Sequence, residues 1–197
     1  MNSSGGKYKM VLGFTITGQD NDSYLKEDLY GKNISECIDY IANREKYITE
    51  DFRISKTKYD YSYTYDGALI VSQRFKDFCE KLEFTDIEFH KLQAQPNFYL
   101  FKVNSVIEFD SERRKTRFLE YNEKCGEYNE VVGAVPVCLK DNQKIKKGFY
   151  RTDIEFGRGY AKSPLIIVDK DIYKKIQKEK FKGLYGEKIL DKYNWEK

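Results

Sequence analysis

One local pattern occurs twice in this sequence. In ALIVSQRFKDFCEKLEF (68–84) and PLIIVDKDIYKKIQKEKF (164–181), a short apolar run is followed by Ser72 or Asp169 and then by apolar residues at helical spacing. Ser and Asp are favoured helix N-caps because their side chains accept hydrogen bonds from the free amides of the first turn. Each segment therefore predicts a buried strand that leads directly into an amphipathic helix. Two copies so far apart do not make a solenoid, whose repeats stack one on the next.

The rest of the chain is rich in strand patterns. Strands are predicted within 7–18, 87–92, 97–109 and 149–156, and two more around a charged turn in 112–140. A further helix is predicted to begin at Asn33, which has the capping-box spacing with Glu36. We expect an α+β fold in which a mixed, largely antiparallel sheet is covered by two or three amphipathic helices.

The cleanest alternation lies in KYDYSYTYDG. Its four tyrosines fall on one face of the predicted strand, because successive side chains of a strand point to opposite sides; they are Tyr59, Tyr61, Tyr63 and Tyr65. The Asp-Gly dipeptide that follows favours a tight turn, which would fold this strand back onto the next apolar run as a hairpin. The tyrosine face has two interpretations: a half-buried sheet face under a helix, or a partner-binding surface, since tyrosine gives a large contact area at small entropic cost.

The length and composition bound the domain organisation. At 197 residues the chain has the length of one domain. Its hydrophobic content of 40% and charged content of 34% are those of an ordinary globular protein. We expect a single domain over 1–197, which divides, if at all, into an N-terminal subdomain at 1–57 and a core at 66–190.

The charge balance and the rarity of histidine argue against several kinds of site. A net charge of +3 is too small to predict nucleic-acid binding, which needs a concentrated positive surface. His90 is the only histidine, so the chain cannot build a multi-histidine metal site. None of the four cysteines forms a C-x-x-C pair, and Cys37 and Cys79 fall on apolar helix faces, where a thiol behaves as a small hydrophobe. We expect neither a metal nor a cofactor.

The sequence also bears on location. No stretch approaches the roughly 20 apolar residues that a membrane-spanning helix needs. The N-terminal run at 7–18 alternates with threonine and glycine, so it is typical of a strand rather than of a signal-peptide core. With its cysteines interpreted as reduced thiols, we expect a cytoplasmic protein that makes no membrane contact.

Signatures of enzymes are sparse. The sequence has neither a G-x-x-x-x-G-K-[ST] phosphate loop nor a G-x-S-x-G nucleophile elbow. Asp153 and Glu155, two residues apart on a predicted strand, leave open one alternative, a small carboxylate-based hydrolase or nucleotide-modifying enzyme. A third possibility is an RNA-binding module that would combine the basic runs at 113–117 and 144–147 with the tyrosines.

Four segments within 66–190 together resemble a known family. They are ALIVSQRFKDFCEKLEFTDIEFHKL, NFYLFKVNSVIEFD, FYRTDIEF and PLIIVDKDIYKKIQKEKFKGLYGEKI. The shared order is an apolar strand ending in serine before a helix, a Tyr/Phe-rich strand pair, and a late apolar strand with a short helix and a glycine-containing tail. This order resembles a bacterial immunity-protein family of polymorphic toxin systems, known from myxobacterial examples and formerly catalogued as a domain of unknown function. No invariant chemical motif anchors the resemblance.

The resemblance implies a non-enzymatic, cytoplasmic inhibitor that binds a cognate toxin and blocks it by steric occlusion. It supplies no binding residues that can be transferred to this chain. From the sequence itself, the tyrosine face is one candidate contact surface. The densest acidic stretch is another, because a cationic nuclease site would be met by acids; it comprises Glu120, Glu123, Glu127 and Glu130.

Overall fold

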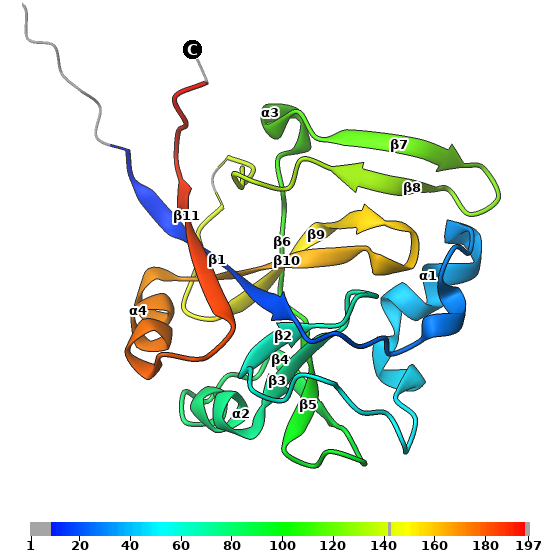
Figure 1. The fold of residues 1–197 in the computed structure, drawn as a ribbon. Coiled ribbons are helices and arrows are strands. Elements are labelled where there is room, and N and C mark those ends of the chain that lie inside the picture. Colours follow the sequence, from blue (N-terminus) through cyan, green and yellow to red (C-terminus); the bar gives the residue numbers. More distant parts are fainter. Residues whose placement is uncertain (1–8, 142, 196–197) are drawn as a thin grey trace, which may run out of the picture.

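The computed structural model describes residues 9–141 and 143–195 (Figure 1). The first two residues of the strand predicted at 7–18 lie outside this range. The strands are β1 Val11–Asp20, β2 Tyr61–Tyr63, β3 Leu69–Ser72, β4 Ile87–Lys91, β5 Phe98–Val103, β6 Val106–Ile107, β7 Arg117–Asn122, β8 Glu127–Val132, β9 Phe149–Arg158, β10 Ser163–Val168 and β11 Leu184–Leu190. The helices are α1 Ile34–Ala42, α2 Gln73–Glu80, α3 Ser111–Arg114 and α4 Lys170–Glu179, with short 3-10 helices η1 Glu27–Leu29, η2 Arg44–Tyr47 and η3 Gly159–Ala161.

The described strands form one sheet of eleven strands in the order β4-β5-β3-β2-β1-β10-β9-β8-β7. Outside this path, β11 pairs with β1 and β6 pairs with β9. The β1–β2 and β6–β9 pairs are parallel, and the other pairs in the described chain are antiparallel. The ten-residue strands β1 and β9 each contact three neighbours, so they connect the parts of the sheet.

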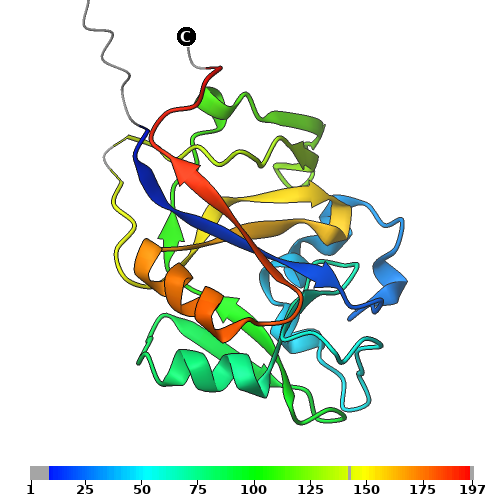
Figure 2. The same ribbon diagram turned by 60° about the vertical axis from the view of Figure 1, so that its left-hand side comes forward.

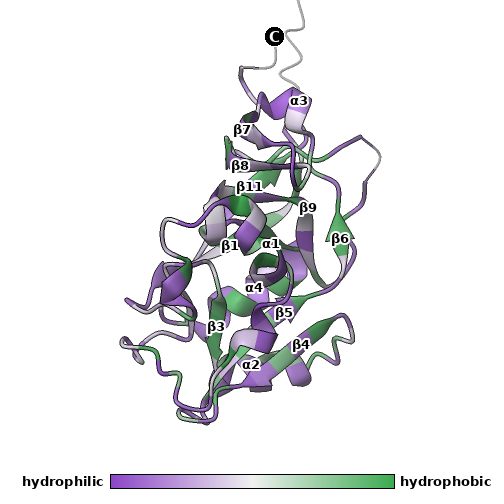
Figure 3. Cartoon of the chain, turned by 90° about the vertical axis from the view of Figure 1, so that its right-hand side faces the viewer, coloured by the Kyte–Doolittle hydropathy of each residue, from purple (hydrophilic) through white to green (hydrophobic). Residues whose placement is uncertain are grey.

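The α+β class with a mixed, mainly antiparallel sheet is confirmed. The helices are few beside eleven strands, and α3 is a single turn. A layer of helices that covers the whole sheet therefore stays a prediction. Figure 3 shows hydrophobic colour on β3, whereas α2 carries much hydrophilic colour, as expected for a helix with one buried stripe.

The repeated strand–cap–helix pattern forms in both copies. The Ser72 side chain accepts a hydrogen bond from the Phe75 amide, and Asp169 accepts from the amides of Asp171 and Ile172. The capping box predicted at Asn33 is also present at the start of α1. Each helix therefore begins where its capping residue predicts.

The two copies share one core. Figure 2 shows α2 and α4 side by side on the same side of the molecule. Phe181, just after α4, packs its ring 5.1 Å from Phe75 and 5.3 Å from Phe78, both on the buried stripe of α2. Tyr173 of α4 stacks on Phe14 of β1 at 3.8 Å. The repetition thus places two similar helices against a single hydrophobic cluster.

The chain after α4 is a strand that the sequence patterns did not predict. β11 pairs antiparallel with β1 along most of its length. Gly186 in this strand lies directly over the Tyr173 ring, where an added Cβ would come within 2.2 Å of a ring carbon. A glycine is required at this point because the sheet and the tyrosine of α4 approach so closely.

The N-terminal third packs into a second core with β3 and β5. Leu25, Cys37 and Ile54 lie in the same buried cluster as Ile70 and Leu100. Residues from both of the parts suggested by the sequence, 1–57 and 66–190, therefore share this core. A third cluster fills the space near β9 and includes Phe109, Val131, Phe156 and Ile167.

A buried carboxylate organises this N-terminal region. Asp66 is fully buried, and it accepts hydrogen bonds from the Leu25 amide at 3.1 Å, the Lys26 amide at 2.7 Å and the Tyr40 hydroxyl at 2.6 Å. Its main-chain carbonyl accepts from the Arg44 guanidinium at 3.2 Å. A buried charge is costly unless it is hydrogen-bonded, so these donors explain why an acid is tolerated here.

Arg44 extends this network to the other side of the molecule. Its guanidinium also donates to the carbonyls of Ile41 at 3.1 Å, Tyr160 at 3.3 Å and Lys162 at 2.5 Å. One side chain therefore connects α1, the β2–β3 loop and the segment between β9 and β10.

The predicted hairpin forms, but its first strand is shorter than the run of tyrosines. β2 pairs antiparallel with β3, with Tyr61 opposite Val71, and Gly67 adopts a left-handed φ of +80° in the loop. The strand comprises only three residues. Tyr61 is fully buried within the core under α2, and its ring packs on Phe75 at 5.2 Å. Of the two interpretations of the tyrosine run, the burial of Tyr61 supports a sheet face under a helix, and a three-residue strand does not align all four tyrosines.

Tyr40→Phe is expected to lower the free energy of unfolding by about 2 kcal/mol, because it leaves the buried Asp66 carboxylate short of a donor. Urea denaturation measures the change. Tyr65→Phe is the matched control: its hydroxyl donates to the exposed Asp22 carboxylate at 2.9 Å, and water can replace that bond, so the loss should stay below about 0.5 kcal/mol. Equal losses in the two variants would contradict the role assigned to Asp66.

Candidate functional site

The hairpin β7–β8 carries the most prominent exposed apolar surface. It lies at one end of the sheet, on the far side of the molecule from α2 and α4 (Figure 1). Phe118 and Leu119 are each 37% exposed, Tyr121 is 56% exposed and Tyr128 is 36% exposed. The Tyr128 ring contacts both Phe118, at 5.3 Å between centroids, and Tyr121, at 4.9 Å. We call these four residues the hairpin patch.

The backbone of the hairpin is distorted at one residue. Glu120 has a left-handed φ of +58°, although the pairing register of β7 with β8 is the same on both sides of it. A non-glycine residue in this region is strained, and such residues are held in place only by specific contacts. Here Glu120 accepts from the Asn129 amide and pairs with Arg158 at 3.0 Å.

β7 is also the last strand of the sheet order. Within the described chain it pairs with β8 alone, so its outer edge has main-chain amides and carbonyls without a strand partner. An unpaired edge can accept an added strand from another protein. The hairpin patch and this edge lie on the same element.

The four predicted acidic residues all lie on this hairpin, but most are engaged. Glu120 and Glu130 pair with Arg158 at 3.0 and 3.5 Å, and Glu127 pairs with Lys162 at 3.4 Å. Of the four, only Glu123 makes no ion pair within the described residues. Arg158 and Lys162 offset two of these four negative charges, and the expectation that the acids meet a cationic partner stays a prediction.

The predicted tyrosines are dispersed. Tyr61 is buried and has no surface to offer a partner, so it is removed from the predicted contact set. Tyr63 lines an interior pocket, and burial raises the pKa of its hydroxyl to about 12. Tyr59 is half-buried, and Tyr65 is 43% exposed with its hydroxyl on Asp22. These four side chains do not form one contact surface.

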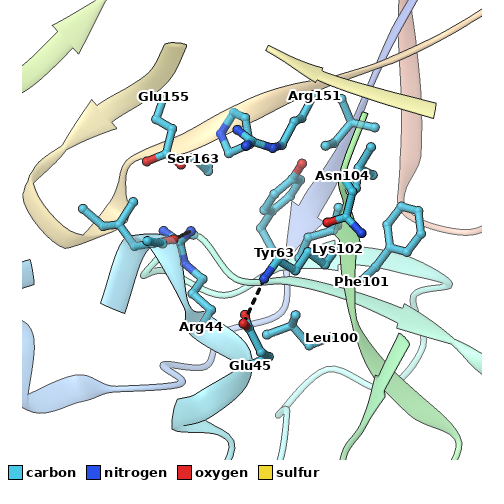
Figure 4. Close-up of a pocket in the computed structure, with 17 residues that line it drawn as sticks. Arg44, Glu45, Tyr63, Leu100, Phe101, Lys102, Asn104, Arg151, Glu155 and Ser163 are labelled. Atoms are coloured by element: carbon cyan, nitrogen blue, oxygen red, sulfur yellow. Dashed lines mark hydrogen bonds and ion pairs between the residues drawn. The ribbon is translucent and has the colours of Figure 1, made fainter. Parts of the chain in front are cut away.

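An interior pocket of about 250 Å³ lies where η2, β5 and β9 face one another (Figure 4). On one side Lys102 and Glu45 form an ion pair of 2.8 Å, with Arg44 beside them. On the other side lie Arg151 and Glu155, both from β9. The pocket was not predicted, because its polar residues come from parts of the chain that are far apart in sequence.

Glu155 has an unusual environment. Burial raises the pKa of its carboxyl, and the nearby charges of Arg44, Lys162 and Arg151 oppose this effect. The Glu155 side chain makes no hydrogen bond or ion pair with any described residue. It lines both the interior pocket and a neighbouring groove of about 340 Å³ beneath β8.

Asp153, the second carboxylate of the pair considered for catalysis, also lines this groove. Its carboxylate accepts a hydrogen bond from the Phe109 amide at 2.8 Å, which gives it a structural role. Within the described residues no group of three or more His, Cys, Asp or Glu side chains is placed to hold a metal ion. Catalysis by this pair stays an untested alternative.

Comparison with known proteins adds no assignment. No protein-family model matches the chain, and no curated protein matches it. In the part of the chain that the structure describes, none of the helices has the length and apolar character required to cross a membrane. The immunity-protein resemblance therefore stays a prediction.

Glu155→Gln is expected to stabilise the protein at pH 7 by up to about 1 kcal/mol. Because the pKa of Glu155 is raised in the folded state, the folded protein holds this proton to a higher pH than the unfolded chain does, and wild-type stability falls as the pH rises through the folded pKa. Glutamine does not ionise, so its advantage should disappear below the unfolded pKa of about 4.3. Thermal melts across pH 4–8 measure the difference, with Glu123→Gln as an exposed control. A variant that melts below the wild type at pH 7 would refute this account.

Proposed function

We propose that this protein is an immunity protein, which binds a cognate bacterial toxin domain and blocks it by steric occlusion. The observation that carries the proposal is the hairpin patch: four exposed aromatic and aliphatic side chains on an edge hairpin with locally strained backbone. Exposed apolar clusters rimmed by polar residues are typical of protein-binding sites, and tyrosine is enriched among the residues that contribute most to binding. The resemblance of residues 66–190 to an immunity family points to the same function.

The hairpin suggests how the toxin is held. Phe118, Tyr121 and Tyr128 provide a contact area that is already ordered by ring packing, so little side-chain entropy is lost on binding. The outer edge of β7 can pair with an extended segment of the toxin, which adds main-chain hydrogen bonds. Glu123, the one of the four hairpin acids without an ion pair among the described residues, favours a basic toxin surface.

The same proposal places the protein in the cytoplasm, where it would meet an incoming toxin. Its four cysteines are free, and Cys37, Cys79 and Cys138 are buried. Free, buried thiols are common in reducing compartments.

Co-expression with the toxin domain encoded beside its gene tests the function. We expect restored growth of a host that is otherwise killed, and a complex that elutes as one species on a sizing column. Survival without any complex, or a complex that does not protect, would contradict inhibition by occlusion.

Tyr121→Ala is expected to weaken the toxin complex at least about tenfold, because it removes the most exposed ring of the hairpin patch. Tyr185→Ala is the matched control: Tyr185 is 52% exposed on β11, outside the patch. Calorimetry with the purified toxin domain measures both, after circular dichroism shows that both variants fold. Equal affinities for the two variants would remove the hairpin from the proposed interface.

A further inference from the structure

The interior pocket is lined by one arginine side chain that has no ion-pair partner in the described part of the chain. The Arg151 side chain, half-buried on β9, makes no hydrogen bond or ion pair with any described residue, although it lines the pocket. Its guanidinium nitrogens are not among the buried polar atoms that lack a partner, so they reach solvent through the pocket, and a ligand with acceptor oxygens could bind them directly. Its neighbours in the pocket are engaged: Lys102 with Glu45, and Arg44 with four main-chain carbonyls.

The charges of the pocket favour an anion. The lining has three cationic side chains, Arg44, Lys102 and Arg151, against two carboxylates, Glu45 and Glu155, which leaves one positive charge in excess. The carbonyls around Arg44 satisfy its hydrogen bonds but do not neutralise its charge.

Part of the remaining lining is apolar. Ile41 and Leu100, which pack in the same cluster, form an aliphatic wall beside the polar groups. A space of about 250 Å³ exceeds the needs of a simple inorganic ion and suits a small organic molecule that has one charged end.

We propose that this pocket binds a small organic anion, a carboxylate or a phosphate monoester, with its charged group on Arg151 and its apolar part against Ile41 and Leu100. A guanidinium can donate two parallel hydrogen bonds to either group, so both chemistries are recognised in the same way. This site is separate from the hairpin patch, and it does not depend on the proposed immunity function.

Titration of the full chain with phenyl phosphate and with benzoate, followed by two-dimensional NMR, tests the proposal. We expect saturable shifts at the amides of Lys102 and Asn104 with at least one probe, and the comparison of the two shows whether phosphate or carboxylate is preferred. Inorganic phosphate should bind at least about tenfold more weakly than phenyl phosphate because it lacks a part that contacts the apolar wall.

Two variants change the affinity in opposite directions. Arg151→Ala should weaken binding of the preferred probe at least about tenfold, whereas Arg117→Ala, an exposed arginine on β7, should leave it unchanged. Glu155→Gln should strengthen binding about threefold or more, because it removes a negative charge that faces the anion. Absence of saturable binding, shifts confined to the hairpin, or equal affinity in the Arg151 and Arg117 variants would overturn the proposal.

Discussion

The fully buried carboxylate of Asp66 is the constraint on which the arrangement of this protein depends. An ionised group without water must be surrounded by donors. Those donors come from the loop after β1 and from Tyr40 of α1. Arg44, bonded to the carbonyl of the same residue, reaches the segment between β9 and β10. These contacts fix the position of the N-terminal third relative to the β2–β3 hairpin and to the β9–β10 side of the sheet.

This arrangement bears on the two features of functional interest, the interior pocket and the hairpin patch. The interior pocket exists because η2, β5 and β9 are held facing one another, with Arg44 in the wall. The groove beneath β8 shares Ile41, Ala42 and Glu155 with the pocket. The hairpin patch extends beyond this groove, and Phe118 and Tyr128 line its rim. A protein-binding surface and a small-molecule site would therefore have adjoining walls.

Sequence patterns predicted the local structure well where side chains interact with their own backbone. The caps at Asn33, Ser72 and Asp169, the β2–β3 hairpin and the two strands around the charged turn all form. β11 was missed because its burial pattern depends on pairing with β1 at the opposite end of the chain. The tyrosine run left two interpretations open because periodicity gives the side of a strand but not whether that side meets solvent, and the structure surrounds Tyr61 with a core.

The sequence by itself determined the α+β class, the helix starts and the scarcity of recognisable catalytic motifs, because these follow from composition and from contacts between near neighbours in the chain. The tertiary structure alone decided which charges are engaged and which are not. Arg158 forms ion pairs with both Glu120 and Glu130, while Arg151 lines a pocket and has no ion-pair partner among the described residues. Such pairings join residues whose separation in sequence says nothing of their distance in space, since long-range strand pairing and burial bring them together.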